Sequence, residues 1–423
     1  MTNLFVVKSM VLLVGIQLGA NAWAAPPLLI THARVWTLDR SRQDLDERLD
    51  AQILVTEGKI ACVSASQQRC PQPSDAQIYD AQGQIVLPGL IESLARIGQV
   101  EVDAEESSHD GVAAKSSNNA QIQAIDGLTL HSRAVEAARQ GGVTVSIARP
   151  LGAALIAGSS VAFWTRDGPV DEVVVKNALA IHVNLGEEAK QDLAGVGARS
   201  GQIALLRTIL QQVGRLYSAD HGKKPKEAAE KESLERLRDD PAVQALRTAL
   251  EAGLPLVVHA HHAEDILAVL RLKDLWTPGL MIAGGAEAHA VARQLAKAKV
   301  PVLLGPVRVA PYQFALLRAD VHAAGVLQRA GVVVALATAD THQARNLRWE
   351  AGFAVAAGLD HDAAVAALTR VPANLWHLPP GVGEIRVGTT ANLLVFDGDP
   401  LTFEGHLRLL LVGESQTRDP KQN

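Results

Sequence analysis

The chain has 423 residues, of which 48% are hydrophobic and 20% are charged, a composition typical of a folded globular protein and not of a disordered one. Its formal net charge of -5 at pH 7 is spread along the chain without a basic stripe. A protein that binds nucleic acid needs such a stripe to neutralise phosphates, so nucleic acid is excluded as the expected partner.

Residues 1–24 have the order of features found in a secretory signal peptide. Lys8 precedes an apolar run from Met10 to Ile16, and small residues lead to Ala24. This order predicts cleavage and an exported protein, either periplasmic or secreted. The apolar run is shorter than the roughly 20 residues that cross a bilayer as a helix, so no stable membrane insertion is expected after cleavage. The alternative is an uncleaved membrane anchor.

The chain has two cysteines, Cys62 and Cys70. In an oxidising compartment they pair if their Cα atoms come within roughly 7 Å, and otherwise they remain free thiols. A bridge across so short a loop adds modest stability, because closing it removes little chain entropy. Neither cysteine has a His or Cys neighbour at the spacing of a metal site.

Residues 25–87 and 376–423 share a pattern of short β-like runs separated by turns. The pattern predicts a small β-sandwich domain built from the N- and C-terminal segments together. Its strands are expected at Leu29 to Leu38, Gln52 to Val55, Lys59 to Val63, Gln84 to Leu87, Gly383 to Val387 and Asn392 to Phe396.

Residues 88–375 alternate apolar strands with amphipathic helices, which predicts the α/β fold class. So many β-α units favour a closed (β/α)8 TIM-type barrel over an open sheet. One segment, Lys223 to Glu251, carries opposite charges at helical spacing and predicts a solvated helical excursion. Strands are expected at Val143 to Ile147, Val173 to Val183, Leu254 to Ala260, Leu280 to Ala283, Val300 to Leu304 and Val332 to Thr338, with helices at Ala263 to Leu275, Ala286 to Lys299, Pro311 to Ala330 and Ala344 to Ala357.

Short motifs along the chain follow one another in a distinctive order. They are Val86 to Glu92, Gly142 to Val145, Leu185 to Glu187, Ala198 to Gly201, Val258 to Ile266, Ala339-Asp340 and Val382 to Pro400. This order resembles the amidohydrolase superfamily, specifically its imidazolonepropionase-like branch, and the match covers nearly the whole mature chain. The resemblance implies a metal-dependent hydrolase barrel with a small β domain, although a fold does not by itself fix a function.

The resemblance also implies a set of metal ligands, which this sequence keeps only in part. Members of the superfamily carry His-x-His at the end of the first strand, where this chain has Leu94-Ala95-Arg96. The fourth-strand position, often a carboxylated lysine, falls on His182, and the sixth-strand histidine position falls on Gly284. Only His259 and Asp340 match their family roles as ligands, and Asp340 is also the implied catalytic base.

A catalytic zinc usually has three protein ligands and one open position, so His259 and Asp340 need a third. The candidates are His182, near a strand end, and His261, two residues beyond His259. The predicted cofactor is therefore at most one divalent metal, zinc by preference, or none. Each candidate also has a structural explanation, with His182 as a packing residue and with His261 and Asp340 as helix caps.

Further polar residues lie close to these motifs. Arg96 stands where a ligating histidine would project, and a cation there argues against a two-metal centre but suits a substrate carboxylate. By resemblance Glu187 and Arg199 bind substrate, and the alternative is an ion pair that orients a loop. His262 and His289 are expected to face solvent on helices.

The leading functional hypothesis is an exported hydrolase that acts on a non-peptide carbon–nitrogen bond of a small molecule, with a degenerate, at most mononuclear metal site. One alternative is a catalytically inactive protein of the same fold that binds a small ligand or partners an active relative. Another is a carboxylate-binding protein centred on Arg96. The expected partners are a small molecule and further subunits of a homo- or hetero-oligomer.

Overall fold

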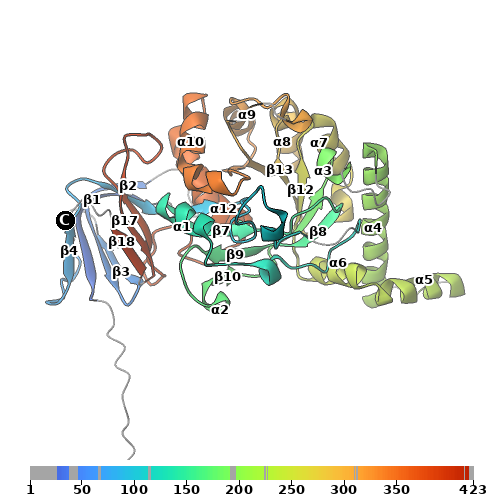
Figure 1. Cartoon of the computed structure of the whole chain (residues 1–423), viewed down its shortest axis with the longest axis horizontal. Helices are drawn as coiled ribbons and strands as arrows, with labels where there is room; N and C mark the ends of the chain where they lie inside the picture. Colours follow the sequence, from blue (N-terminus) through green and yellow to red (C-terminus); the bar gives the residue numbers. More distant parts are fainter. Residues whose placement is uncertain are drawn as a thin grey trace, which may run out of the picture.

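The computed structural model describes residues 26–37, 46–64, 68–112, 116–190, 197–222, 225, 227–308, 310, 313–413 and 415–418. The predicted signal peptide, residues 1–24, lies outside this set. Among the described helices, none combines the length and the apolar character that crossing a membrane requires. The described strands form three sheets, shown with their helices in Figure 1.

One eight-stranded sheet is built from both ends of the chain and lies at the left of Figure 1. Its order is β18-β17-β16-β5-β1-β2-β3, with β4 beside β1, so the eight strands are hydrogen-bonded into one sheet, and the predicted sandwich packing of this domain stays a prediction. The N-terminal and C-terminal parts meet where β16 pairs antiparallel with β5. The strands are β1 Leu28–Thr37, β2 Asp46–Thr56, β3 Lys59–Ser64, β4 Gln77–Asp80, β5 Ile85–Pro88, β16 Asn392–Phe396, β17 Leu407–Val412 and β18 Ser415–Arg418.

The two cysteines form a disulfide on the edge of this sheet. Cys62 lies in β3, and Cys70 follows at a Cα–Cα distance of 5.8 Å. Buried Cys70 packs with Leu29 of β1 and Leu54 of β2. Of the two states left open by the sequence, the structure shows the bridged one.

Replacing both Cys62 and Cys70 by alanine is expected to lower the free energy of unfolding by up to about 2.5 kcal/mol and to leave the fold intact. The bridge closes a loop with a sequence separation of 8, so it restricts the unfolded chain only slightly. Urea denaturation of the wild type and the double variant measures the difference. A variant that fails to fold would show that the bridge holds more of the sheet than its own edge.

The region between the two ends holds two further sheets. Their orders are β10-β9-β7-β6 and β15-β14-β13-β12-β11-β8. β6 and β7 run parallel, as do all neighbours from β11 to β15, whereas β8 pairs antiparallel with β11, and β9 antiparallel with β7 and β10. The strands are β6 Leu90–Glu92, β7 Val143–Ala148, β8 Ile156–Ser159, β9 Val161–Trp164, β10 Val174–Lys176, β11 Ile181–Asn184, β12 Leu256–Ala260, β13 Leu280–Gly284, β14 Val302–Leu304 and β15 Val334–Leu336.

These two sheets enclose a common interior. Ile91 of β6, Val145 of β7 and Val257 of β12 belong to one buried cluster, so side chains of both sheets meet inside. Between β6 and β15, the carboxylate of Glu92 accepts hydrogen bonds from the backbone N and Oγ1 of Thr338 at 2.9 and 2.7 Å. The α/β prediction is confirmed, but the strand ladders do not run continuously around a barrel of eight parallel strands, because the antiparallel β8 occupies the edge beside β11.

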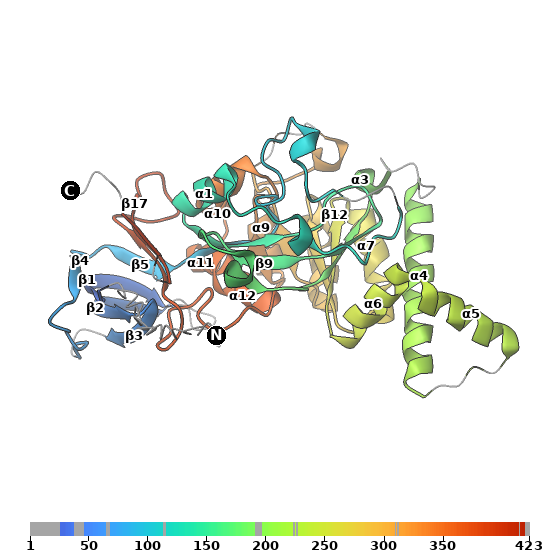
Figure 2. The same cartoon turned by 60° about the horizontal axis from the view of Figure 1, so that its bottom comes forward.

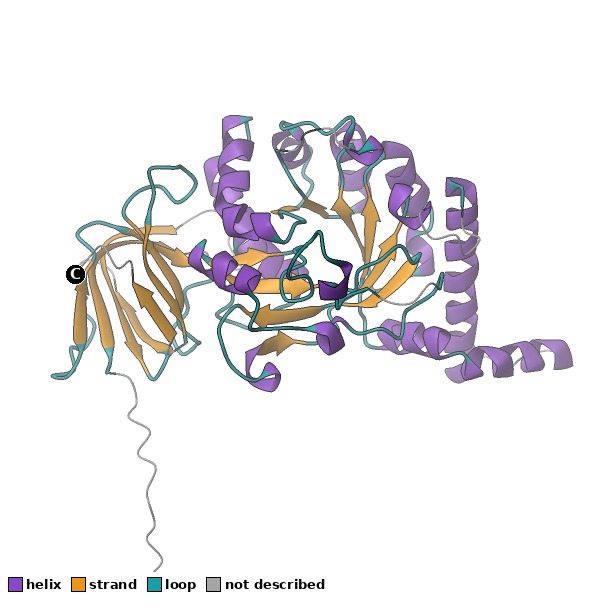
Figure 3. Cartoon of the chain, viewed as in Figure 1, coloured by secondary structure: helices purple, strands orange, loops and turns teal. Residues whose placement is uncertain are grey.

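The helices lie mainly outside the strands, as Figure 3 shows for the six-stranded sheet. The charged segment forms α5 and α6, and α5 projects beyond α4 in both Figure 1 and Figure 2. Leu234 is the one buried residue of α5, in keeping with a solvated excursion. The helices are α1 Arg133–Gln140, α2 Val170–Val173, α3 Glu187–Lys190, α4 Arg199–Asp220, α5 Ala228–Asp239, α6 Pro241–Glu251, α7 Ala263–Leu270, α8 Ala292–Ala298, α9 Ala323–Arg329, α10 Leu347–Ala356, α11 His361–Leu368 and α12 Arg370–Leu375.

Candidate ligand cavity

A cavity of about 560 Å³ lies at the carboxyl ends of the parallel strands. Arg96 and Arg149 reach it from beyond β6 and β7, and His261, Phe314 and Ala339 from beyond β12, β14 and β15. The loops that follow parallel strands converge at this edge, which is where ligands bind in α/β folds. Of the residues predicted for the site, Arg96, Glu187, His259 and His261 line the cavity.

His182 and His259 form a buried pair at the floor of the cavity. They lie on the neighbouring strands β11 and β12, and Nδ1 of His182 is 2.9 Å from Nε2 of His259. The His182 ring stacks on Trp376 with a centroid distance of 6.2 Å. Among the described residues, no hydrogen-bond partner reaches the buried Nε2 of His182. His182 therefore supports His259 from behind, and His259 faces the cavity.

Burial lowers the pKa of both His182 and His259 well below its ordinary value, and the positive charge of Arg149 lowers it further. Desolvation disfavours the charged imidazolium, and a nearby cation disfavours it further. Both rings are therefore neutral near pH 7, so one ring donates and the other accepts in the bond between them. His259 thus presents a neutral polar group to the cavity.

The imidazole of His261 fills the space left by the absent side chain of Gly284. A Cβ on Gly284 would lie 2.5 Å from Cε1 of His261, far inside van der Waals contact. Gly284 also has a φ of +84°, in the left-handed region that glycine tolerates best. The imidazole of His261, which follows the neighbouring strand β12, therefore lies against the place that a side chain at Gly284 would take.

Gly284→Ala is expected to destabilise the protein by about 2–3 kcal/mol, because the new methyl group must both accept a strained φ and displace His261. Gly331→Ala is the matched control, since Gly331 has a φ of +82° and no heavy atom within 4 Å of the place that an alanine methyl group would take. It should cost only the strain of about 1–2 kcal/mol. Urea denaturation measures the loss of stability in each variant. Adding His261→Ala to Gly284→Ala should reduce the loss at Gly284 to that of Gly331→Ala. Equal losses at both glycines would contradict the packing of His261 on Gly284.

Arg149 is the residue of this cavity that sequence reasoning missed. It is 8% exposed, follows β7 directly, and lies close enough to the histidine pair to lower both pKa values. The available signal was its place immediately after a predicted strand. Arg96 lies near the cavity opening and is exposed, and among the described residues none pairs with it by hydrogen bond or ion pair through its side chain. The cavity thus holds one buried and one exposed guanidinium group.

Asp340 does not lie where the resemblance implies. Ala339 lines the cavity with a φ of +55°, whereas Asp340 is not among the residues around it. Instead, Oδ1 of Asp340 accepts a hydrogen bond from the backbone N of Gln343 at 2.9 Å, at the start of the 3-10 helix His342–Asn346. Asp340 therefore does not line the cavity with His259, and its carboxylate bonds the first turn of that helix from the position before the N-cap residue Thr341, not as the N-cap itself.

His262 is buried between two carboxylates, which corrects the expectation that it faces solvent. Its Nε2 is 3.2 Å from Oε2 of Glu187, and its Nδ1 is 3.2 Å from Oε1 of Glu287. Against the effect of desolvation, hydrogen bonds and the nearby imidazole lower the pKa of Glu187 and of Glu287. Glu187 lines the cavity, but its carboxylate is already engaged by His262.

Arg199 and His289 also lie away from the cavity lining. Arg199, at the start of α4, forms a salt bridge with buried Asp265 of α7. Arg199 is thus engaged in an ion pair between α4 and α7, in keeping with the structural role that was the alternative to substrate binding for this residue. His289 lies in the short 3-10 helix Ala288–Val291 and is partly buried.

The donor set of the cavity does not fit a catalytic zinc. Such an ion takes three protein ligands, and among the described residues no group of three or more His, Cys, Asp or Glu side chains is placed to hold a metal. His182 and His259 direct nitrogens at each other in a hydrogen bond. The positive charge of Arg149 beside them would also repel a dication. The residues present suit binding of an anion better than activation of water.

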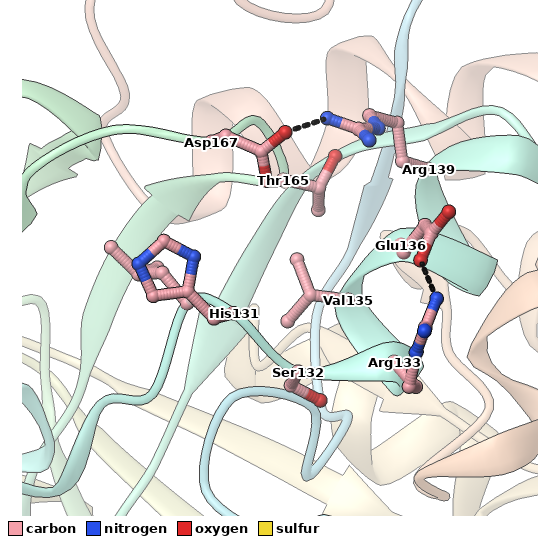
Figure 4. Close-up of a pocket in the computed structure, with 9 residues that line it drawn as sticks. His131, Ser132, Arg133, Val135, Glu136, Arg139, Thr165 and Asp167 are labelled. Carbon is pink, nitrogen blue, oxygen red and sulfur yellow. Dashed lines mark hydrogen bonds and ion pairs between the residues drawn. The ribbon is translucent and has the colours of Figure 1, made fainter.

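A second pocket, of about 340 Å³, lies beside α1 and is shown in Figure 4. Its charged groups pair within the pocket, Arg133 with Glu136 at 3.0 Å and Arg139 with Asp167 at 3.5 Å. Ser132 accepts a hydrogen bond from the backbone N of Ala134. This pocket is a polar surface depression whose charges already pair with each other.

Solved structures with a similar fold include three hydrolases. An amidohydrolase from Thermotoga maritima MSB8 has a TM-score of 0.79 and 24% identity, over 93% of this chain and 100% of that chain. A putative prolidase from Bifidobacterium longum has a TM-score of 0.55 and 17% identity, over 94% and 96% of the two chains. An adenosine deaminase from Xanthomonas campestris, with bound zinc, has a TM-score of 0.51 and 15% identity, over 92% of each chain.

No protein-family model matches the sequence, and no curated protein matches it. The three solved structures cover nearly the whole chain, and at these identities their likeness concerns the fold. The superfamily resemblance carried by the sequence motifs thus agrees with the arrangement of the strands and helices in space. The chain has the fold of the amidohydrolases.

Proposed function

We propose that this chain is an exported protein of the amidohydrolase fold that binds a small carboxylate in its cavity without metal-dependent hydrolysis. The observation that carries the proposal is the buried guanidinium of Arg149 beside the His182–His259 pair. A buried cation attracts an anionic ligand strongly, because little water screens the interaction. A planar guanidinium also matches the two oxygens of a carboxylate.

The other groups around the cavity support an anionic ligand. Arg96 adds a second cation near the opening, and neutral His259 offers a polar contact. Among the described lining residues, Glu187 is the one acid, and His262 engages its carboxylate. The described lining residues thus include two guanidinium groups and one carboxylate.

Export is supported by two features of the N-terminal region. The signal-like order of residues 1–24 predicts secretion, and the Cys62–Cys70 bridge is typical of proteins that fold in an oxidising compartment. The expected oligomeric partners stay predictions.

Calorimetry with propionate and with its uncharged amide tests the proposal, alongside metal analysis of protein purified without chelator. We expect propionate to bind, propionamide to bind at least about tenfold more weakly, and no stoichiometric metal to be present. Equal affinity for both compounds would overturn carboxylate recognition. Stoichiometric zinc that is lost in His259→Ala would instead restore the hypothesis of a metal-dependent hydrolase acting on carbon–nitrogen bonds.

A further inference from the structure

The cavity differs in chemistry from one side to the other. Arg96 and Arg149 come from segments that follow β6 and β7 of the four-stranded sheet. The segment after β14 of the six-stranded sheet supplies a mainly apolar wall, which is made of Pro306, Phe314, Ala315 and Leu316. One part of the cavity therefore suits a negative group, and another suits an apolar group.

Phe314 is the main apolar surface left uncovered on this wall. It lines the cavity and is 66% exposed, whereas its neighbours Ala315 and Leu316 are buried. Its ring is tilted against His262 at a centroid distance of 5.2 Å, which fixes one face and leaves other ring surface for a ligand. Covering exposed aromatic surface with a second apolar group is favourable, and a second ring adds a specific stacking contact.

Glu187 indicates which ligands this wall would reject. Glu187 and Phe314 both contact His262, so the carboxylate of Glu187 lies on the same side of the cavity as the aromatic ring. A second negative group placed there would be repelled by Glu187. A ligand with a carboxylate at both ends is therefore disfavoured.

The size of the cavity points in the same direction. At about 560 Å³ it falls within the range of roughly 300–1,000 Å³ typical of sites for whole small molecules. A two- or three-carbon acid would occupy only the part near the arginines. The remaining space adjoins the apolar wall.

We propose that the ligand is a monocarboxylate with an aromatic body, held with its carboxylate at Arg149 and Arg96 and with its ring against Phe314. This inference rests on the proposed function, since it names the class of carboxylate that the same cavity takes. Phe314 is then the residue that selects for the aromatic body. Arg149 selects for the charge.

Calorimetry with propionate, 3-phenylpropionate, 3-phenylpropionamide and succinate tests the ligand class. We expect 3-phenylpropionate to bind at least about tenfold tighter than propionate, because its ring covers Phe314. The amide should lose at least about tenfold relative to the acid, and succinate should gain nothing over propionate.

Phe314→Ala should remove most of the advantage of the phenyl ring, measured as the ratio of the affinities for 3-phenylpropionate and propionate in the same variant. Phe403→Ala is the matched control, because Phe403 is 65% exposed, packs on Trp349 at 5.2 Å and does not line the cavity. It should leave the ratio of the two affinities unchanged.

The outcomes separate this inference from the proposed function. Equal binding of propionate and 3-phenylpropionate, or a ratio unaffected by Phe314→Ala, overturns the aromatic class and leaves carboxylate binding in place. Tighter binding of succinate overturns the preference for one carboxylate. Failure of every acid to bind overturns the proposed function itself.

Discussion

Replacing Arg149 by methionine is expected to weaken carboxylate binding about 100-fold, a loss of about 2.7 kcal/mol. Arg149 is 8% exposed, so its charge acts on a ligand across protein rather than across water. Methionine keeps most of the length and apolar volume of the side chain and removes only the guanidinium. Titration calorimetry with propionate at constant pH and salt measures the loss.

Arg96→Met should weaken the same binding only about threefold, because Arg96 is exposed and its charge is screened by solvent. Arg207→Met, an exposed arginine of α4 outside this cavity, should have no effect. Thermal unfolding of each variant checks that the fold is kept. A larger loss for Arg96→Met than for Arg149→Met would place the carboxylate at the opening rather than in the interior and would contradict the proposed geometry.

Glu92 is expected to make the stability of the protein depend on pH between about 4.5 and 7. Burial raises the pKa of Glu92 to about 7, in spite of hydrogen bonds from Leu94 and Thr338 that favour the charged form. Since the pKa is higher in the folded state than in the unfolded chain, the protonated carboxyl stabilises the fold. That contribution is fully present below about pH 4.5 and is lost as the pH rises through 7. Its upper limit is about 3 kcal/mol.

Glu92→Gln isolates this effect. The wild-type carboxyl accepts the backbone N of Leu94 on one oxygen and the backbone N of Thr338 on the other. A glutamine amide offers only one oxygen, so one backbone donor loses its acceptor, at a cost of about 1–3 kcal/mol. The stability advantage of the wild type over Glu92→Gln should be largest at pH 4.5 and should shrink by pH 8.

Urea denaturation of both proteins from pH 4.5 to 8 measures that advantage. Glu235→Gln, on the exposed surface of α5, is the control and should show no such trend. A constant difference between the wild type and Glu92→Gln across this range would mean that Glu92 keeps the same charge in the folded and unfolded states.

The regular elements could be predicted from the sequence where hydrophobic pattern alone decides them. The runs around β12 and β13 are apolar apart from His259 because both faces are covered, and their predicted bounds lie within two residues of the observed ones. The expected strand Val173 to Val183 instead divides into β10 and β11, which belong to different sheets. The polar pair Lys176-Asn177 marks the division, and Ala178 just beyond it has a φ of +50°. β8 and β9, which belong to different sheets, were also missed, and small residues dominate β8.

The site could be predicted only as far as the superfamily resemblance marks its positions. His259 and Arg96 were singled out because they fall on ligand positions of that family, and His261 because it lies two residues beyond His259. Asp340 was assigned to the cavity, but Ala339 before it lines the wall, and the left-handed φ of +55° at Ala339 turns the chain in a way that the sequence pattern does not show. Arg149 belongs to no motif, and its place just after the predicted strand Val143 to Ile147 was too weak a signal to separate it from an ordinary surface arginine.

The terminal sheet has a consequence for synthesis of the protein. β5 ends at Pro88, and its partner β16 begins at Asn392, roughly 300 residues later. While the ribosome makes the intervening chain, one edge of the N-terminal strands has no partner and can associate with other nascent chains. Completion of this sheet must therefore wait until the chain has been made as far as β16, and a chain cut before Asn392 would keep the same edge open for good.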